Sequence, residues 1–338
     1  MKRLTLLLTV MAVLCLLIGS AIAGEILDAV KAKGFVQCGV GDVNGFAKAD
    51  EQGVIKGIDA DTGRAIAAAV FGDASKIKFT TLSAQQRFPA VQSGEVDVLC
   101  RTATHTLHRD TALGLDFAHV TYYDGQGFLI TKKMGVKSAL ELEGATVCVL
   151  PGTTTELNVA DYFRAKGMKW KPVVIEGDAE INKAFMAGRC DVMTGDASNL
   201  FGIRAATSNP DDYMILPEII SKEPLAPAVR QGDSQWLDIV NWTVAAMITA
   251  EEFGITSKNV DKFLKSDNPG IMRFLGTNPG MGKDLGLDEK WAYNIIKQVG
   301  NYGEIFERNV GVKTKLGIAR GLNALWTNGG LMYSPPFK

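Results

Sequence analysis

The segment of this sequence richest in chemistry-bearing side chains is residues 96–117, where an apolar, β-prone run is followed by RTATHTLHR. Thr102, Thr104 and Thr106 alternate along it, and Arg109 follows three residues later. In an extended chain alternate residues share a face, so Thr102 and Thr104 would present hydroxyls and amides together. The planar guanidinium of Arg109 fits a carboxylate through two parallel hydrogen bonds. We expect a cradle for a small anion; the alternative is a polar turn whose Arg pairs with a nearby surface aspartate.

A second pair of segments adds a helix end and a lone carboxylate. The sequence PGTTTE at residues 151–156 follows an expected strand and opens an expected helix. Free N–H groups and the helix dipole at such an end attract anions, although an ordinary N-cap is the plainer interpretation. Asp196 follows the strand expected at residues 191–194, where a cap or turn residue is common. Together, Arg109 and Thr154 would hold a carboxylate and Asp196 an ammonium, which are the two charges of a free amino acid.

Motifs for catalysis or cofactor binding are missing from the sequence. Gly39-Val40-Gly41 follows an expected strand, but Asn44 takes the sixth position of the dinucleotide fingerprint and a turn-rich loop replaces its helix. Of the three histidines, His105 and His108 can share a face, but no third ligand is near, and His119 is more distant. We therefore expect no metal and no cofactor. The sequence also shows no nucleophile with a base and no acid–base pair, which favours binding over catalysis.

The polar groups follow strands of two expected α/β lobes. Alternating strands and helices predict a parallel sheet covered on both faces in each lobe, with a cleft between the two sets of strand ends. Residues 234–338 are mostly helical and have no strand series, so we expect them to pack on the first lobe. The expected strands are 35–40, 77–82, 96–100, 127–131, 146–150, 173–176 and 191–194, and the expected helices are 26–33, 59–71, 85–93, 155–166 and 179–187.

The first 23 residues have the pattern of an export signal. Lys2 and Arg3 form a basic head, an apolar run follows, and Ala21-Ile22-Ala23 forms a small-x-small cleavage site. We expect cleavage after Ala23, because the apolar run is short for a membrane anchor. The remaining 315 residues carry 34 basic and 37 acidic side chains. This near-neutral balance without a basic run argues against nucleic acid as a partner.

Four cysteines remain after the signal, each in or beside an apolar, strand-like run. An exported protein permits disulfides, and four cysteines allow three pairings. Pairing within each lobe would join Cys38 to Cys100 and Cys148 to Cys190. Small buried thiols are the alternative, above all for the first pair.

Several motifs, taken in order, resemble the polar amino-acid family of periplasmic solute-binding proteins of ABC importers, and within it the general L-amino-acid-binding branch. The motifs cover the mature chain nearly end to end; they lie at residues 57–61 (GIDAD), 87–94 (RFPAVQSG), 102–109, 116–117 (DF), 123–128 (YDGQGF), 152–154 (GTT) and 299–308. The resemblance implies an α/β, type II-like periplasmic-binding-protein fold. Two lobes would be joined by two crossover hinge segments, with a helical C-terminal extension packed on lobe 1.

The same resemblance implies domain bounds and a function. Lobe 1 would comprise residues 24–124 and 226–338, and lobe 2 residues 127–222, with crossovers near 122–127 and 223–229. The protein would not be an enzyme. It would be a monomer in the periplasm that binds a broad range of L-amino acids. It would deliver them to the permease and ATPase subunits of an ABC importer. A periplasmic enzyme on the same scaffold, such as a dehydratase of a cyclohexadienyl-type substrate, is the alternative, and the missing acid–base pair disfavours it.

By resemblance, five residues hold the common part of an amino acid. Arg109 would bind the ligand carboxylate in a bidentate pair. Thr104 would give its amide to the carboxylate and its hydroxyl to the amine, and Thr102 would offer a backbone carbonyl. From lobe 2, Thr154 would complete the carboxylate site and Asp196 would bind the amine.

Other positions would meet the ligand side chain. Asp42 and Phe46 match the variable loop after the first strand, where the family often places a polar or aromatic contact. Arg101 stands where small polar residues are common, and His105 where an aliphatic or aromatic residue is expected. Arg101 would either favour acidic ligands or pair with an acid of its own.

Overall fold

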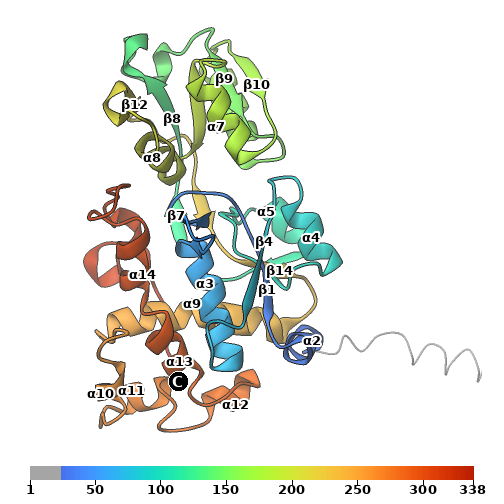
Figure 1. Cartoon of the computed structure of the whole chain (residues 1–338), viewed down its shortest axis with the longest axis vertical. Helices are drawn as coiled ribbons and strands as arrows, with labels where there is room; N and C mark the ends of the chain where they lie inside the picture. Colours follow the sequence, from blue (N-terminus) through green and yellow to red (C-terminus); the bar gives the residue numbers. More distant parts are fainter. Residues whose placement is uncertain (1–23) are drawn as a thin grey trace, which may run out of the picture.

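Two α/β lobes lie one above the other and are joined by two extended segments (Figure 1). The computed structural model describes residues 24–338, and the expected export signal at residues 1–23 lies outside this described part. The connecting strands β7 (Tyr122–Asp124) and β13 (Glu223–Leu225) pair antiparallel to each other. The chain leaves lobe 1 through β7 and returns through β13, which confirms the two-lobe fold with two crossovers.

The sheet of lobe 1 mixes parallel and antiparallel pairs. Its strands are β1 (Val36–Val40), β4 (Ile77–Thr81), β5 (Val98–Leu99), β6 (Leu115–Phe117) and β14 (Ala228–Arg230), and β2 (Lys48–Ala49) forms a separate hairpin with β3 (Ile55–Lys56). The order is β4-β1-β5-β14-β6, with β1 parallel to β4 and β5. The expectation of a parallel sheet is wrong for β14, which is antiparallel to β5 and β6. It follows the return crossover and therefore enters the sheet from the side where β1 and β5 end.

Lobe 2 repeats this arrangement. Its strands are β8 (Gln126–Thr131), β9 (Thr146–Val149), β10 (Lys171–Val174), β11 (Val192–Asp196) and β12 (Tyr213–Ile215). The order is β10-β9-β11-β8-β12, and β9 is parallel to both β10 and β11. Strand β8 follows the first crossover and runs antiparallel to β11 and β12, which corrects the expected parallel sheet for the same reason as in lobe 1.

Helices and short 3-10 turns connect these strands. Lobe 1 carries α2 (Glu25–Lys33), α3 (Ile58–Phe71), α4 (Arg87–Ser93) and α5 (Leu107–Ala112), and lobe 2 carries η1 (Lys132–Met134), η2 (Ala139–Glu141), α6 (Thr154–Ala165), α7 (Asp178–Met186), α8 (Ala197–Ala205) and η3 (Pro210–Asp212). The start of α3 requires glycine: Gly57 has φ 133°, and a Cβ there would lie 2.1 Å from the carbonyl oxygen of Phe46. Its buried, Ala-rich face then packs against β1.

The C-terminal region is helical and packs on lobe 1, as predicted (Figure 1). Its elements are α9 (Ser234–Glu252), α10 (Val260–Phe263), α11 (Pro269–Phe274), α12 (Met281–Leu285), α13 (Trp291–Gln298), α14 (Tyr302–Asn309), η4 (Gly321–Asn323) and η5 (Trp326–Asn328). Trp236, Ile295 and Phe306 are fully buried in the hydrophobic core that contains β1 and α3. An ion pair of 2.7 Å between Asp61 and Arg308 joins α3 to α14. None of the helices within the described residues combines the length and apolarity of a membrane span.

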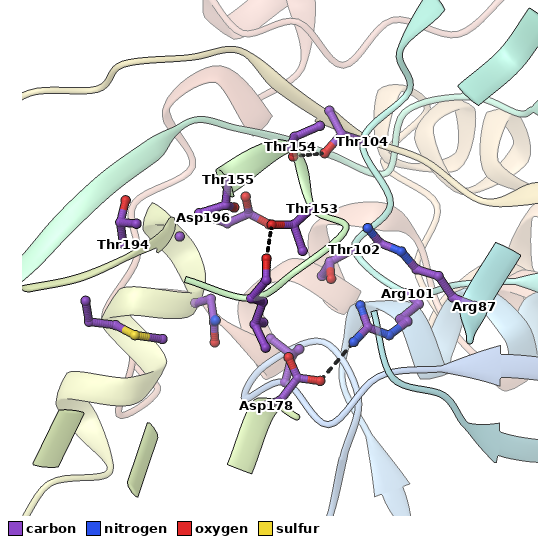
Figure 2. A pocket seen from close by; sticks show the side chains of 15 residues that line it. Arg87, Arg101, Thr102, Thr104, Thr153, Thr154, Thr155, Asp178, Thr194 and Asp196 are labelled. Carbon is purple, nitrogen blue, oxygen red and sulfur yellow. Dashed lines mark hydrogen bonds and ion pairs between the residues drawn. The ribbon is translucent and has the colours of Figure 1, made fainter. Parts of the chain in front are cut away.

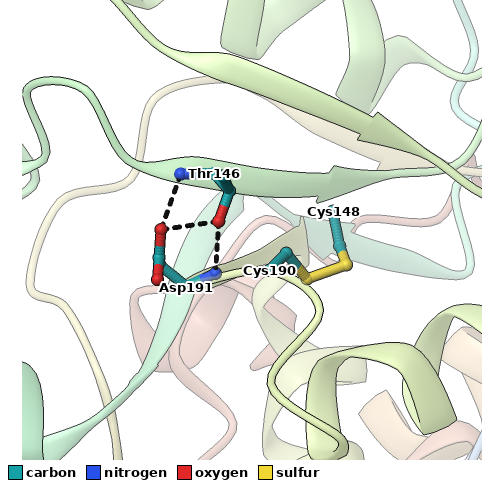
Figure 3. Close-up of a disulfide and its surroundings, with 4 residues drawn as sticks. All are labelled: Thr146, Cys148, Cys190 and Asp191. Carbon is teal, nitrogen blue, oxygen red and sulfur yellow. Dashed lines mark hydrogen bonds between the residues drawn. A yellow bond between two sulfur atoms is a disulfide. The ribbon is translucent and has the colours of Figure 1, made fainter.

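A disulfide between Cys148 and Cys190 fastens β9 to the turn before β11 (Figure 3). The neighbouring residues reinforce the same junction. The Thr146 amide donates to the Asp191 carboxylate at 2.8 Å, and the Asp191 amide donates to the Thr146 hydroxyl at 2.9 Å. The predicted pairing in lobe 2 is therefore present in the structure.

The other expected pairing, Cys38 with Cys100, is contradicted, because both residues are free and buried. Strands β1 and β5 place Cys38 directly opposite Val98, so Cys100 lies two residues further along. The two thiols are still neighbours. The Cys38 thiol raises the pKa of the Cys100 thiol, and burial raises it further. A thiol held in its protonated form and shielded from solvent is a poor partner for disulfide exchange.

The disulfide should contribute measurably to the stability of lobe 2. It closes a segment of 42 residues, so replacing Cys148 and Cys190 with serine is expected to lower the free energy of unfolding by about 2–4 kcal/mol. Urea unfolding of the ligand-free mature protein measures this loss. Thiol titration of the unreduced, denatured mature protein should give Cys38 and Cys100 only. Finding no free thiol would show that the second pair also bonds.

Candidate ligand-binding cleft

The largest concentration of the predicted site residues surrounds a cavity between the lobes (Figure 2). The space between the surrounding atoms is about 570 Å³, open solvent included. Lobe 1 contributes Thr102 and Thr104, and lobe 2 contributes Thr154 and Asp196. Strand ends and a helix N-terminus thus converge on one space from three separate parts of the sequence.

The lobes touch across this cavity. The guanidinium of Arg101 in lobe 1 bonds to the Asp178 carboxylate at the start of α7 at 2.8 Å, and its Nε donates to the Leu82 carbonyl at 2.7 Å (Figure 2). The Asn44 amide donates to the Gly202 carbonyl of α8 at 3.3 Å. Arg101 therefore lines the cavity and has an acid of its own, which is the second of the two alternatives that the sequence left open.

Thr102 is held in an unusual backbone conformation by a buried carboxylate. It is the one non-glycine residue in the described chain with positive φ, at 35°. Its amide donates to the Asp59 carboxylate at 2.9 Å, and Asp59 is only 5% exposed. Burial raises the pKa of Asp59 to about 6, against the lowering influence of the Thr102 amide and Arg101. The GIDAD motif thus reaches the cleft indirectly, through the backbone of the threonine loop.

The raised pKa of Asp59 gives a pH-dependent contribution to stability with a defined sign. Between pH 4 and 6 the folded state binds this proton more tightly than the unfolded state, so stability falls as the pH rises. In Asp59→Asn this loss is absent. The unfolding free energy of the variant relative to wild type should rise by about 3 kcal/mol from pH 4 to pH 7 in ligand-free urea titrations. A difference that stays constant with pH would contradict the assignment.

Two buried arginines lie beside the threonine loop. Arg109 is 6% exposed, donates to the Thr104 carbonyl at 2.9 Å and stacks on Phe88 with its guanidinium carbon 4.9 Å from the ring centre. It lies behind Thr104 and does not line the cavity. Arg87, which the sequence analysis missed as a site residue, does line it (Figure 2). Arg87 is 3% exposed and stacks on the same ring at 4.7 Å, and its Nε has no hydrogen-bond partner among residues 24–338.

The N-terminus of α6 faces the cavity from lobe 2. Thr153 is the N-cap, and its hydroxyl accepts from the Glu156 amide at 3.2 Å, which confirms the plainer interpretation of this segment. The cap leaves the first-turn amides of Thr154 and Thr155 without acceptors in the helix. Both residues line the cavity. One turn therefore combines an N-cap with free first-turn amides, which are groups that suit an anion.

Asp196 offers an uncommitted carboxylate to the same cavity. It is the last residue of β11 and the N-cap of α8, but its side chain makes no cap hydrogen bond. No donor among residues 24–338 bonds to this carboxylate. Burial raises its pKa, and the nearby carboxylates of Asp124 and Glu223 raise it further. A positively charged ligand group placed here would relieve both effects.

Three other expected residues lie away from the cavity. Asp42 pairs with Lys48 at 2.7 Å on the surface. Phe46 is 1% exposed and packs edge-on against Tyr122 with ring centres 5.1 Å apart, so it belongs to the core. His105 stacks on Phe117 at 4.6 Å outside the cleft. The structure therefore does not place these three side chains in the cavity lining, and the loop after β1 turns its aromatic residue inward.

Comparison with known proteins identifies the family. A family model described as bacterial extracellular solute-binding proteins, family 3, matches residues 37–260. The chain belongs to this family. It is 59% identical over 322 residues to the general L-amino acid-binding periplasmic protein AapJ of Rhizobium johnstonii, with 94% of each chain covered. It is 52% identical over 327 residues to the glutamate/glutamine/aspartate/asparagine-binding protein BztA of Rhodobacter capsulatus, covering 96% of this chain and 97% of the relative.

Solved structures of other binding proteins share the fold. A periplasmic binding protein of an ABC transporter from Brucella ovis, with glutathione bound, matches with a TM-score of 0.90 and 57% identity, covering 92% of this chain and 99% of that one. A cysteine-binding protein from Campylobacter jejuni matches with a TM-score of 0.60 and 26% identity, over 72% of this chain and 96% of that one. The family and these relatives are binding proteins, which gives no support to an enzyme on this scaffold.

Proposed function

We propose that this family 3 protein binds L-amino acids in the cleft and delivers them, in the periplasm and as a monomer, to the permease and ATPase subunits of an ABC importer. One observation carries the proposal: the cavity has a cationic side and an unpartnered carboxylate. Arg87 and the first-turn amides of α6 suit an anion, and Asp196 suits a cation. A zwitterion with both charges on one carbon matches this arrangement.

The individual roles follow from these positions and from the family resemblance. The resemblance assigns the ligand carboxylate to Arg109, which lies behind Thr104, and Arg87, which lines the cavity, would share it from lobe 1. The amides of Thr154 and Thr155 would complete this site from lobe 2. Asp196 and the Thr104 oxygen would hold the ammonium. Because each lobe supplies part of each charge site, a bound ligand stabilises the closed form over the open one.

The surroundings of Arg101 support broad specificity. Its charge is already neutralised by Asp178, at side-chain exposures of 4% and 15%. The cleft therefore does not demand an acidic side chain to balance an isolated arginine. The names of the relatives agree with such breadth, since AapJ is called a general L-amino acid-binding protein and the Brucella ovis protein was solved with glutathione. The γ-glutamyl end of glutathione is itself a free amino-acid group.

A ligand panel tests the proposal directly. The mature protein, freed of bound ligand by unfolding and refolding with its disulfide intact, is melted with each of the 20 L-amino acids, glutathione, D-enantiomers and sugars. A ligand that binds only the folded state stabilises it by RT ln(1 + [L]/Kd) and so raises the melting temperature. We expect many L-amino acids to do so and the sugars to have no effect. If no amino acid raises the melting temperature, the proposed function is wrong.

A further inference from the structure

The strand that returns to lobe 1 carries a buried glutamate whose role no sequence motif indicates. Glu223, in β13, is 1% exposed. Its Oε2 accepts from the Thr104 hydroxyl at 2.5 Å and from the Thr154 hydroxyl at 3.0 Å. Its Oε1 accepts from the Asn158 amide at 2.8 Å and from the Ser221 hydroxyl at 2.6 Å. One hinge carboxylate thus accepts a hydrogen bond from one cavity-lining threonine of each lobe.

These bonds fix the direction of two hydroxyl groups. A carboxylate only accepts hydrogen bonds, and a hydroxyl has a single hydrogen to donate. With that hydrogen directed to Glu223, Thr104 and Thr154 can present only lone pairs to the cavity that both line. Their oxygens lie 3.4 Å apart, on facing segments of the two lobes (Figure 2). Oxygens in this state suit a donor, and an ammonium has three hydrogens to donate.

We propose that Glu223 is a positioning residue that makes the Thr104 and Thr154 hydroxyls acceptors and so builds an ammonium-selective site at the hinge. This assignment rests on the proposed amino-acid binding function and adds to it the group that enforces a free amine. It also connects the site to closure, because the Thr154 hydroxyl comes from lobe 2 and Glu223 lies on the connecting strand. Only the closed arrangement brings both hydroxyls to one carboxylate oxygen.

The test compares ligands that differ only in the amine. Calorimetry measures L-glutamate against L-2-hydroxyglutarate, and L-alanine against L-lactate, on wild type and on Glu223→Gln. Glutamine keeps one acceptor oxygen and replaces the other with a donor, so it can no longer accept from all four of these partners. Where its amide nitrogen faces Thr104 and Thr154, their hydroxyls turn their hydrogens into the cavity. We expect amino-acid affinity to fall by about 10- to 100-fold and hydroxy-acid affinity by about threefold or less. The preference for the amine should therefore shrink by about the ratio of these two losses.

Two further variants keep the test decisive. Glu218→Gln is the matched control: Glu218 also accepts a hydroxyl, from Ser138, but Ser138 does not line the cavity, so the amine preference should not change. If Glu223→Gln does not fold, Asn158→Ala removes one anchor of the Glu223 carboxylate and should reduce the same preference by a smaller factor.

The possible failures are distinguishable. If Glu223→Gln weakens the amino acid and its hydroxy analogue equally, or weakens neither, Glu223 is only a structural residue and the assignment is overturned. If wild type binds no amino acid at all, the proposed function itself fails.

Discussion

Arg109→Ala is expected to weaken amino-acid binding by about 30-fold to several thousand-fold, because it removes one partner of a buried, charge-assisted pair. The guanidinium has five donors, and the structure commits one nitrogen, to the Thr104 carbonyl. Burial lowers the pKa of Arg109, while Glu223 and Asp196 raise it, so the charge is held among opposing groups. Calorimetry with an L-amino acid from the panel measures the loss.

Two companion variants separate the possible carboxylate partners. Arg109→Lys keeps the charge but loses the planar fork, so most of the loss should remain. Arg87→Ala tests the arginine that lines the cavity in the structure. If Arg87→Ala abolishes binding while Arg109→Ala leaves it intact, the carboxylate site is centred on Arg87 instead. The melting temperature without ligand must be measured for each, since Arg109 also supports the Thr104 loop.

Local sequence patterns predicted the part of the cleft that is built from residues at the ends of strands and at the start of a helix. Thr102, Thr104, Thr154 and Asp196 all follow a strand or open a helix, and parallel strands that end at one edge bring such residues together. This is why four distant positions in the sequence could be assigned to one cavity. The expected strand 191–194 ended two residues early, but the error left Asp196 at the strand end.

The same reasoning missed residues whose role depends on the direction in which the side chain points. Arg87 lies inside the RFPAVQSG motif on a short helix, and nothing local shows that its face meets the cleft. Phe46 has the composition of a loop contact but packs on Tyr122 in the core. The partner of Arg101, Asp178, comes from the opposite lobe, 77 residues away in sequence. The Arg101–Asp178 contact depends on how the two lobes meet, and the Phe46–Tyr122 contact depends on how lobe 1 packs. Sequence spacing encodes neither.

The cysteines show the same limit at the level of strand register. Both expected pairs join neighbouring parts of one lobe. Cys148 and Cys190 meet because the turn before β11 brings Cys190 to β9. Cys38 and Cys100 lie on paired strands but are offset by two residues. Register depends on the packing of the whole sheet, so spacing in the sequence could propose the pairs but could not choose between them.

Asp196→Asn should weaken amino-acid binding by about 3–5 kcal/mol, because a neutral amide replaces the charge that faces the ligand ammonium. The change is nearly isosteric and removes a desolvated carboxylate that no other residue in the described chain bonds to. The ligand-free protein should therefore melt at the same temperature or slightly higher at neutral pH. Calorimetry and ligand-free melts, with the exposed Asp161→Asn as control, measure the two effects separately.

The pH dependence of binding distinguishes Asp196 from a purely structural residue. Burial and the neighbouring Asp124 raise the pKa of Asp196, so the free cleft tends to hold a proton that the ammonium must displace. Affinity in wild type should therefore rise with pH through the range in which this proton is lost, approaching tenfold per pH unit at its steepest. In Asp196→Asn this proton is absent, and the slope should shrink to the part due to Asp124, whose pKa burial raises to about 6. Unchanged affinity and an unchanged pH profile in the variant would place the ammonium site elsewhere in the cleft.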